Sequence, residues 1–391
     1  MNRRDFLASA GTLTLAAATS SAGHAAEAKK YRACIIGDTK QGEYGHSLHM
    51  AFALRPDVEV VGLADPDEAG RAKHAAEAKS QRTYTDYREM LEKEKPDLVS
   101  IAPRWTIHHK EYLLAAAAVG AHGFLEKPIS SDLVEADEMV RAVEAKNLKW
   151  AMAFNFRATP VIQHVRRLVV DETILGDVLE MRGRGKEDNR AGGEDLLVLG
   201  THVFDMMRFL AGDPLWCTAD ITTEGRPARK EDVHEATEPL GPVVGDRIHA
   251  MYGFPRGVVG YFGTTKSKDG NGGRWGLDIY GSKGVMTIRA DVTPMVSLLR
   301  DSSWAPGGKS VQWEPLPGAP DMSMKDPVAE RNLPIINDLI ASIIEDRRPK
   351  VSLQDGRDSL EMIQAVYDSY VQGRRVELPL KDRTHPLPRW G

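Results

Sequence analysis

Short apolar runs alternate with amphipathic stretches over the first part of the chain, from Tyr31 to about Trp150. The runs have the length of β-strands, and the stretches between them have the apolar spacing of surface helices. This alternation is typical of βαβ units, so we expect a doubly wound parallel sheet over residues 29–150. The expected strands are Arg32–Ile36, Val58–Ala64, Leu98–Ala102 and a short run within residues 120–129.

The pattern changes after Trp150. Strand-like runs now lie among turns rich in glycine and proline, and two later stretches, Pro327–Ile344 and Asp358–Val371, have apolar residues at helical spacing. The segment Gly225–Gly245 is rich in proline, glutamate and charge, and we expect a mobile insertion or lid there rather than core. A second α/β domain is therefore predicted over residues 151–391. Its expected strands are Val178–Arg182, Arg247–Phe254, Val258–Thr264, Leu277–Tyr280 and Val285–Arg289.

Residues 1–28 predict an export signal rather than part of a domain. Asn2–Leu7 reads NRRDFL, an uncharged stretch continues to Ser21, and small residues end near Ala25 or Ala28. This pattern is typical of the twin-arginine signal, which exports folded proteins to the periplasm and is then removed. The alternative is a membrane anchor, but the apolar stretch is only about half of the roughly 20 residues that span a bilayer. No later stretch approaches a membrane span.

The composition narrows the function classes. The chain has 391 residues and a net charge of −5, with acidic and basic residues interspersed. This length fits two domains with ample core, and the charge pattern shows no basic face for a nucleic acid. The two cysteines are Cys34 and Cys217, and Cys34 lies in an apolar run, which favours a buried thiol over a disulfide. No spacing of cysteine and histidine indicates a metal site, so none is expected.

The loop after the first expected strand has glycines at Gly37, Gly42 and Gly45, followed by a helix-like stretch through Leu54. Glycines let backbone amides approach a pyrophosphate, and the start of a helix favours its charge. The spacing departs from GxGxxG, so a glycine-rich surface turn explains the loop equally well. The second expected strand ends at Asp65, where a carboxylate accepts the ribose hydroxyls of NAD and repels the 2′-phosphate of NADP. Strand, glycines and acid together favour NAD, and the alternative for Asp65 is a helix N-cap.

A lysine follows the last expected strand of this domain. Residues 120–129 read GAHGFLEKPI, so the strand delivers Glu126 and Lys127 at its carboxyl end. Ligands bind beyond the carboxyl ends of the strands in open parallel sheets, and a lysine there can reach a reacting hydroxyl. The alternative is a lysine that only pairs with Glu126 or with a surface acid.

Several motifs occur in the order found in one known family. They are the strand ending at Asp65, the segment Pro103–His109, GluLysPro at 126–128, GlyThrHisValPheAsp at 200–205, TyrGlySerLysGly at 280–284, ArgArgProLysVal at 347–351, the helix-like stretch 359–369 and GlyArgArgValGluLeuPro at 373–379. In these motifs the chain resembles the Gfo/Idh/MocA family of oxidoreductases, over essentially all of its length after the signal. The resemblance implies a Rossmann domain followed by an α/β domain whose large, mostly antiparallel sheet carries the substrate site, and it implies a dimer or tetramer.

The resemblance also supports a set of cofactor contacts from the first domain. Trp105 lies where relatives contact nicotinamide or substrate and has a ring that can stack on a sugar or a cofactor, although a loop packed rigidly against the neighbouring strand is an equally good interpretation. The expected cofactor-binding residues are Gly37, Thr39, Gly42, Tyr44, Gly45, Asp65, Pro103, Trp105, His109, Glu126 and Lys127.

Oxidation of a carbinol needs a base for the hydroxyl proton. Lys127 can be this base if burial or a neighbouring positive charge lowers its pKa. The resemblance places His202, in GlyThrHisValPheAsp, at the substrate, where it can shuttle a proton. The alternative for His202 is a histidine that only completes the start of a helix.

Val198 breaks the family pattern. Relatives commonly have an acid four residues before this histidine, and valine can neither accept a proton nor hydrogen-bond a sugar. Glu194 and Asp195 are the expected substitutes, and we expect the polar run upstream, with Asp188 and Arg190, to bind a polyol. A solvated loop is the alternative for that run.

These residues predict an NAD-dependent oxidoreductase that acts on a sugar, a sugar derivative or a cyclitol. Dinucleotides are scarce outside the cytoplasm, so an exported enzyme is expected to fold around its cofactor and keep it tightly bound. One alternative is a redox-neutral glycoside hydrolase or lyase that works through a transient keto-sugar. Another is a non-catalytic protein that binds the cofactor or a sugar.

Overall fold

The computed structural model describes residues 30–267, 272–291, 294–307, 311–324, 326 and 330–391. The predicted export signal, residues 1–28, lies outside the described residues, as do residues 327–329 at the start of a predicted helix. Among the helices in the described ranges, none has the length and apolar character that a membrane span needs.

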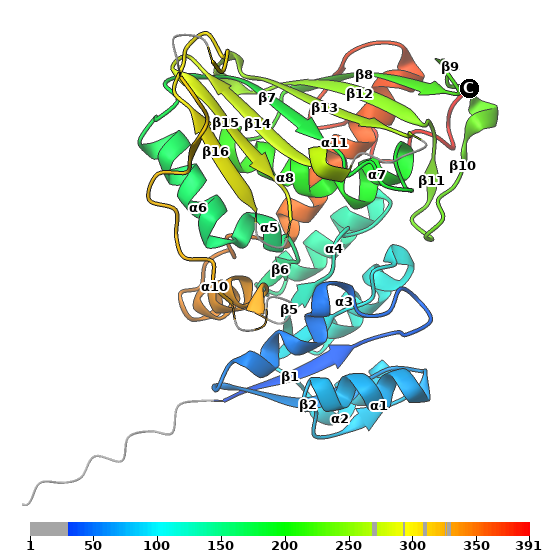
Figure 1. Ribbon diagram of the computed structural model, residues 1–391. Coiled ribbons are helices and arrows are strands. Elements are labelled where there is room, and N and C mark those ends of the chain that lie inside the picture. The colour runs from blue at the N-terminus through cyan, green and yellow to red at the C-terminus, as the bar shows by residue number, and fades with distance from the viewer. Residues whose placement is uncertain (1–29, 268–271, 292–293, 308–310, 325, 327–329) are drawn as a thin grey trace, which may run out of the picture.

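A parallel sheet of six strands forms the N-terminal part of the molecule, in the order β3-β2-β1-β4-β5-β6 (Figure 1). The inner strand β4 is buried along its whole length, which explains why it is apolar except for Ser100, whose hydroxyl donates to the Leu48 carbonyl. At the start of three of the helices, an aspartate side chain accepts hydrogen bonds from backbone amides and fixes where the helix begins. The elements are β1 (Tyr31–Ile36), β2 (Val58–Ala64), α1 (Glu68–Glu77), β3 (Thr83–Tyr84), α2 (Tyr87–Glu94), β4 (Leu98–Ile101), α3 (His109–Ala118), β5 (His122–Leu125), α4 (Leu133–Glu144) and β6 (Trp150–Met152). The predicted Rossmann sheet is confirmed.

The prediction of a regular helix after the glycine loop was wrong. The chain forms two short 3₁₀ segments there, η1 (Gly45–Met50) and η2 (Phe52–Leu54), and His46 and Ser47 have positive φ angles of 44° and 56°. Long-range hydrogen bonds explain this backbone. The Gly45 amide donates to the Ala102 carbonyl at 2.8 Å, and the Asn332 side chain donates to the His46 carbonyl at 2.7 Å.

A second, larger sheet covers the other end of the molecule (Figure 1). Its path is β17-β16-β15-β14-β7-β13-β12-β8-β18, with β9 paired to β8, and the pair β7 and β13 is parallel while its other pairs are antiparallel. The strands are β7 (Val178–Arg184), β8 (Trp216–Thr223), β9 (Arg226–Pro227), β12 (Arg247–Gly253), β13 (Val259–Thr265), β14 (Gly276–Gly281), β15 (Gly284–Arg289), β16 (Met295–Leu299), β17 (Glu314–Pro315) and β18 (Val376–Glu377). The predicted fold class is confirmed. Cys34 on β1 and Cys217 on β8 are both buried free thiols.

Helices fill the space between the two sheets (Figure 1). They are α5 (Asn155–Ala158), α6 (Pro160–Arg166), a π-helical turn η4 (Arg167–Asp171), α7 (Gly193–Val198), α8 (Gly200–Ala211), α10 (Leu333–Ile344) and α11 (Leu353–Gln372). Helix α11 contacts β8 and α8 of the second domain and α4 and β6 of the first. It begins before the predicted Asp358 because Ser352 and Asp355 form a capping box, and it ends at Gly373 in the left-handed conformation. This helix therefore joins the two cores.

The segment Gly225–Gly245, predicted as a mobile insertion or lid, contains regular secondary structure. It contains β9, a 3₁₀ turn (Lys230–Asp232) and a small hairpin of β10 (His234–Glu235) and β11 (Pro242–Val243). Leu240 is buried, so the expectation that this segment lies outside the core is corrected in part.

Candidate active site

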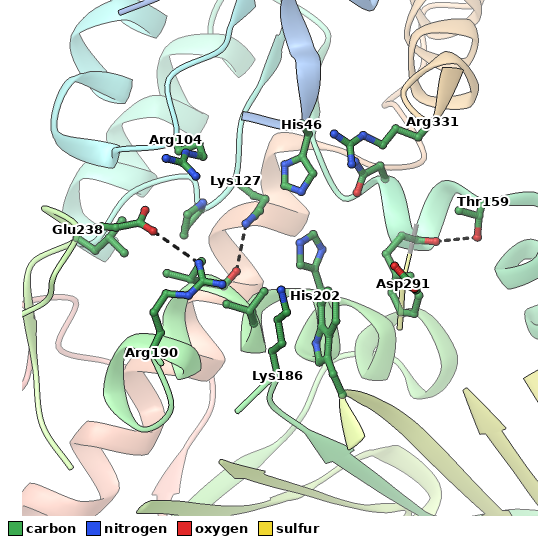
Figure 2. Close-up of a pocket in the computed structure, with 17 residues that line it drawn as sticks. His46, Arg104, Lys127, Thr159, Lys186, Arg190, His202, Glu238, Asp291 and Arg331 are labelled. Carbon is green, nitrogen blue, oxygen red and sulfur yellow. Dashed lines mark hydrogen bonds and ion pairs between the residues drawn. The ribbon is translucent and has the colours of Figure 1, made fainter. Parts of the chain in front are cut away.

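A cavity of about 350 Å³ lies where loops at the carboxyl ends of the parallel strands meet the second domain (Figure 2). A volume of this size fits a small sugar. Its titratable lining residues come from both domains and are His46, Arg104, Lys127, Lys186, Arg190, His202, Glu238, Asp291 and Arg331.

Lys127 reaches this cavity directly after β5, as its place in the sequence predicts. The side chain is buried, and Nζ donates to the Val198 carbonyl at 3.2 Å. Burial lowers the pKa of Lys127, Glu126 opposes this shift, and Arg190 adds to it. A buried lysine with a lowered pKa in a cavity is a candidate proton acceptor.

His202 lies on α8 and lines the same cavity. Its ring packs among those of His46, Phe154 and Trp275, with centroids 5.9, 5.8 and 6.1 Å away. Within the described residues, the buried Nδ1 atom has no hydrogen-bond partner. Burial, and then the charges of Lys127 and its neighbours, hold the pKa of His202 well below its usual range. The neutral imidazole therefore presents an unused polar atom inside the site.

His46 is a site residue that sequence reasoning missed. Its Nδ1 atom lies 2.7 Å from Oε1 of Glu126, which is fully buried. Burial lowers the pKa of His46 although Glu126 opposes the shift, while His46 and Lys127 hold the pKa of Glu126 below its usual value against the effect of burial. With Nδ1 donating to the carboxylate, Nε2 carries the lone pair. Glu126, which is predicted to contact the cofactor, orients a second histidine in the structure.

The acids expected to replace the missing family acid do not reach the cavity. Asp195 is fully buried and accepts from Thr264 Oγ1 at 2.6 Å and from the Lys186 amide at 3.1 Å. Burial raises the pKa of Asp195. Glu194 accepts from Thr237 Oγ1 at 2.7 Å. Both carboxylates therefore hold neighbouring loops together, and the catalytic role expected for them is corrected.

Of the two residues predicted to bind a polyol in the upstream polar run, only one lines the cavity. Asp188 does not line the cavity and binds Arg190 through two hydrogen bonds, at 2.7 and 3.2 Å, whereas Arg190 does line it. The acids that line the cavity are Glu238, from the predicted lid, and Asp291. No local sequence signal marks these two, because they come from segments far from the motifs.

The segment Pro103–His109 has a supporting role. His109 is fully buried, and its ring nitrogens lie 2.8 Å from the Pro103 carbonyl and 3.0 Å from the Pro128 carbonyl. These contacts fix the loop before α3 to the loop that carries Lys127. Trp105 packs on Gly42, where an added Cβ would lie 2.6 Å from the Trp105 amide.

Asp65 ends β2 at the place that the sequence predicts, and it is fully buried. Its carboxylate accepts from Thr39 Oγ1 at 2.7 Å, from the Thr39 amide at 3.1 Å and from the Tyr44 hydroxyl at 2.8 Å. The N-cap of α1 is Asp67, which accepts from the Gly70 amide at 2.8 Å, so the N-cap interpretation of Asp65 is excluded.

Comparison with known proteins adds the decisive observation. A model of the Gfo/Idh/MocA oxidoreductase family, NAD-binding Rossmann fold, matches residues 31–154, and a model of the family's C-terminal alpha/beta domain matches residues 180–378. The chain belongs to the Gfo/Idh/MocA oxidoreductase family.

Named relatives of this oxidoreductase include sugar dehydrogenases. Levoglucosan dehydrogenase of Pseudarthrobacter phenanthrenivorans is 28% identical over 283 residues, which are 64% of this chain and 72% of that protein. D-apiose dehydrogenase of Paraburkholderia graminis is 27% identical over 374 residues, 90% of each protein. A solved structure of levoglucosan dehydrogenase in complex with NADH and levoglucosan has a TM-score of 0.71 and 21% identity, and the match covers 90% of this chain and 100% of that one. This likeness shows the shared fold.

The first domain of the oxidoreductase fits a dinucleotide in the kind and order of its groups. The loop after β1 supplies glycine amides, and Asp65 supplies a ribose acceptor. Tyr44 packs so closely on Gly37 that an added Cβ would lie 2.0 Å from its ring. Because Thr39 and Tyr44 already donate to the Asp65 carboxylate, ribose hydroxyls that bind Asp65 must replace these donors.

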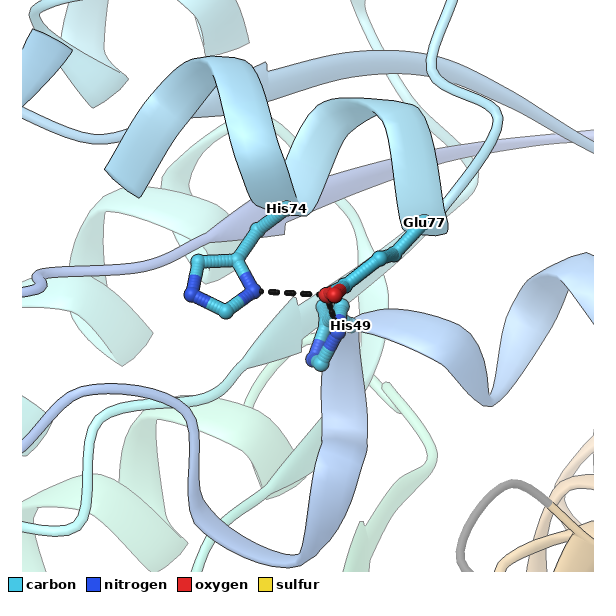
Figure 3. Close-up of side chains that lie close together, drawn as sticks. All are labelled: His49, His74 and Glu77. Carbon is cyan, nitrogen blue, oxygen red and sulfur yellow. Dashed lines mark hydrogen bonds and ion pairs between the residues drawn. The ribbon is translucent and has the colours of Figure 1, made fainter. Parts of the chain in front are cut away.

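Tyr44 also packs against two histidines, His49 and His74, which form a cluster with Glu77. Figure 3 shows this cluster. Oε2 of Glu77 lies 2.9 Å from His49 Nε2 and 2.9 Å from His74 Nδ1, and the Tyr44 ring centroid lies 3.9 Å from that of His74. Burial lowers the pKa of His49 to about 4. The three side chains are close enough to share one cation, with ligand atoms within 4.8 Å of one another. Their spacing in the sequence gives no sign of this, because η1 and α1 meet only in the fold.

Tyr44→Phe is expected to tighten NAD binding by about 2- to 10-fold, because it removes a competing hydrogen bond to Asp65 worth about 0.5–1.5 kcal/mol. The measurement is a titration of cofactor-free protein with NAD, followed by tryptophan fluorescence. Tyr87→Phe is the matched control, because the Tyr87 hydroxyl also donates to a carboxylate, that of Glu111, at 2.8 Å on the surface. Weaker binding by Tyr44→Phe would show that the hydroxyl helps to hold the cofactor.

Proposed function

We propose that this oxidoreductase transfers a hydride between NAD(H) and a CH–OH group of a sugar, a sugar derivative or a cyclitol. The observation that carries the proposal is the joint presence of Lys127 and His202 in a cavity of about 350 Å³ between the two domains. The dehydrogenase names of two relatives that match most of the chain support the same reaction class.

The side chains divide the work as follows. The glycine loop and Asp65 hold the dinucleotide, which when bound supplies the hydride acceptor. Lys127 Nζ accepts the proton of the reacting hydroxyl, and burial favours this role because it lowers the pKa of the lysine towards the neutral amine. His202 offers its unpartnered Nδ1 to a sugar hydroxyl. The alkyl carbons and rings of Val198, Leu199 and Trp275 line the remaining wall and limit water in the site.

We also propose that the protein is exported by the twin-arginine route with NAD tightly bound, and that NADP is not its normal cofactor. The support is the NRRDFL pattern and the carboxylate at Asp65. An assembly of two or four copies through the second sheet is part of this proposal. Its strands expose the large apolar side chains Leu179, Tyr261 and Met295, which a partner can cover.

The test begins with protein purified from its natural compartment without added nucleotide. We expect the absorbance of bound nicotinamide, and we expect it to change when a sugar substrate is added and the oxidised product forms. Protein that contains no nicotinamide and takes up none on incubation with NAD would contradict the proposal.

A redox-neutral cleavage of glycosides is the second candidate function. Two observations favour it: Val198 stands in place of the usual acid, and the His46–Glu126 pair supplies another proton-transfer group at the cavity. Elimination after transient oxidation needs such a base for the C–H proton next to the ketone. Release of an aglycone with no net change in NAD, and entry of solvent deuterium into the sugar, would select this reaction. Accumulation of an oxidised sugar in proportion to NADH would exclude it.

A further inference from the structure

The charges that line the cavity are unbalanced. Among the described residues that line it, five are lysines or arginines but only two are acids, Glu238 and Asp291. Lys127 is removed from this balance if it acts as a neutral base, and an excess of arginine and lysine still remains. The two histidines in the lining have lowered pKa values, which favours their neutral forms, so they add no negative charge to offset this excess.

Most of these cations have partners in the protein. Arg190 binds Asp188 at 2.7 Å and lies 3.6 Å from Glu238, and Lys186 lies 3.6 Å from the same Asp188 carboxylate. One acid, Asp188, is therefore shared between two cations. Arg104 donates to the Gly42 carbonyl at 3.0 Å, which satisfies a hydrogen bond but does not neutralise its charge.

Arg331 is the exception. Within the described residues its guanidinium forms no hydrogen bond and no ion pair, and its Nε atom is buried without a partner. Burial lowers its pKa, and Glu126 is the acid that opposes the shift. A partly buried guanidinium without an acceptor is unfavourable unless a ligand supplies one.

The position of Arg331 in the cavity bears on which anion it can bind. Arg331 lies on the side of His46 and His202 in the cavity (Figure 2), and its charge lowers the pKa of both histidines. The phosphates of a dinucleotide are expected at the glycine loop, where Arg104 contacts Gly42. Arg331 also acts on His202, the residue that the proposed function puts at the substrate.

From these contacts we propose that the substrate is an acidic sugar, and that Arg331 binds its carboxylate. This inference rests on the proposed function. The planar fork of a guanidinium matches a carboxylate with two parallel hydrogen bonds, whereas neutral sugars offer no charge to offset the excess in the cavity. Lys186 and Arg190 on the opposite wall add a longer-range attraction for the anion.

The experiment compares D-glucuronate with D-glucose, and D-galacturonate with D-galactose, on the NADH-loaded protein by calorimetry. We expect at least one uronate to bind about 10-fold or more tightly than its neutral partner, and we expect this difference to shrink at high salt. Arg331→Met should weaken binding of that uronate by about 10- to 150-fold, the range for a hydrogen bond to a charged group. Binding of neutral sugar and of NADH should stay within about twofold. Arg331→Lys should lie between, because it keeps the charge but loses the fork.

Arg348→Met is the matched control, because Arg348 is exposed and does not line the cavity. Thermal unfolding of each variant shows that the fold is intact.

Equal binding of uronate and neutral sugar, or equal weakening of both by Arg331→Met, would overturn the inference. Glucose 6-phosphate and glucose 6-sulfate form a further arm, and tighter binding of either ester than of both uronates would overturn the assignment to a carboxylate. Turnover of neutral sugars alone would overturn the inference while the proposed function stands. Failure to bind NADH at all would instead contradict the proposed function.

Discussion

Lys127→Ala is expected to lower kcat by about 10²- to 10⁴-fold, the usual contribution of a positioned general base. Lys127 lines the cavity, and burial lowers its pKa, which favours the neutral amine that a base needs. The affinity for NADH should change little, because the contacts proposed for the dinucleotide are the glycine loop and Asp65. The measurement is steady-state turnover together with an NADH titration of the same protein.

The pH profile adds a readout that a purely structural lysine would not give. The base must be neutral to act, so kcat of the unaltered protein should rise with pH through the lowered pKa of Lys127 and level off above it. In Lys127→Arg the guanidinium stays charged throughout, so this rise should disappear along with the activity. Lys110→Ala is the control, because Lys110 lies on the surface and pairs with Glu138 at 2.7 Å. Activity within a few-fold of normal in Lys127→Ala would assign the proton transfer to another group, of which His46 is the first candidate.

Local patterns were enough to predict the frame of this molecule. The runs around Ile35, Val61 and Val99 are apolar because their strands are buried on both faces, so they stand out without any knowledge of the fold. The place of Lys127 follows from the same rule, because a residue directly after a parallel strand lies at the ligand edge of the sheet. His202 was found through its family motif. Fold class and family are confirmed, whereas the roles of the site residues remain predictions.

The errors have a common physical cause. The stretch after Gly45 has helical spacing, yet contacts from Ala102 and Asn332 hold it in another backbone conformation. Asp195 is close to Val198 in the sequence, but the cavity meets only the end of α7, and Thr264 binds the carboxylate elsewhere. Long-range contacts decide both outcomes, and one sequence does not reveal them.

The same reasoning explains which site residues were missed. His46 pairs with Glu126 across a separation of 80 residues, and Arg331 enters the cavity from the segment before α10. Neither residue belongs to a motif. A histidine inside a glycine-rich nucleotide loop was the available signal, because such loops favour small residues where the backbone approaches a ligand.

Arg157→Met is expected to lower the free energy of unfolding by about 3–5 kcal/mol, the cost of leaving a buried charge without its partner. Arg157 is buried and donates to Asp205 at 2.6 Å and to Asp355 at 3.1 Å. These bonds tie α5, α8 and α11 together beneath the cavity. Burial raises the pKa of Asp205 to about 7 although Arg157 opposes the shift, so loss of the arginine raises this pKa further.

The pH dependence of the variant follows from that shift. A folded-state pKa above the ordinary value means that the folded protein binds more protons than the unfolded chain, so its stability falls as pH rises from the unfolded to the folded pKa. Arg157→Met should therefore be least stable on the alkaline side of neutrality. Urea unfolding at acidic, neutral and mildly alkaline pH measures this change.

Two further variants separate the buried ion pair from the loss of a long side chain. Adding Asp205→Asn to Arg157→Met removes the unpaired acid, so the double variant should recover part of the stability and lose the added pH dependence. Arg166→Met is the control, because Arg166 is half-exposed and lies 3.4 Å from the exposed Asp171, and such surface pairs contribute about 0–1 kcal/mol. Because α8 also carries His202, Arg157→Met should lower kcat even at temperatures where it is folded. If Arg157→Met and Arg166→Met unfold at the same urea concentration, the buried network does not hold α8 in place.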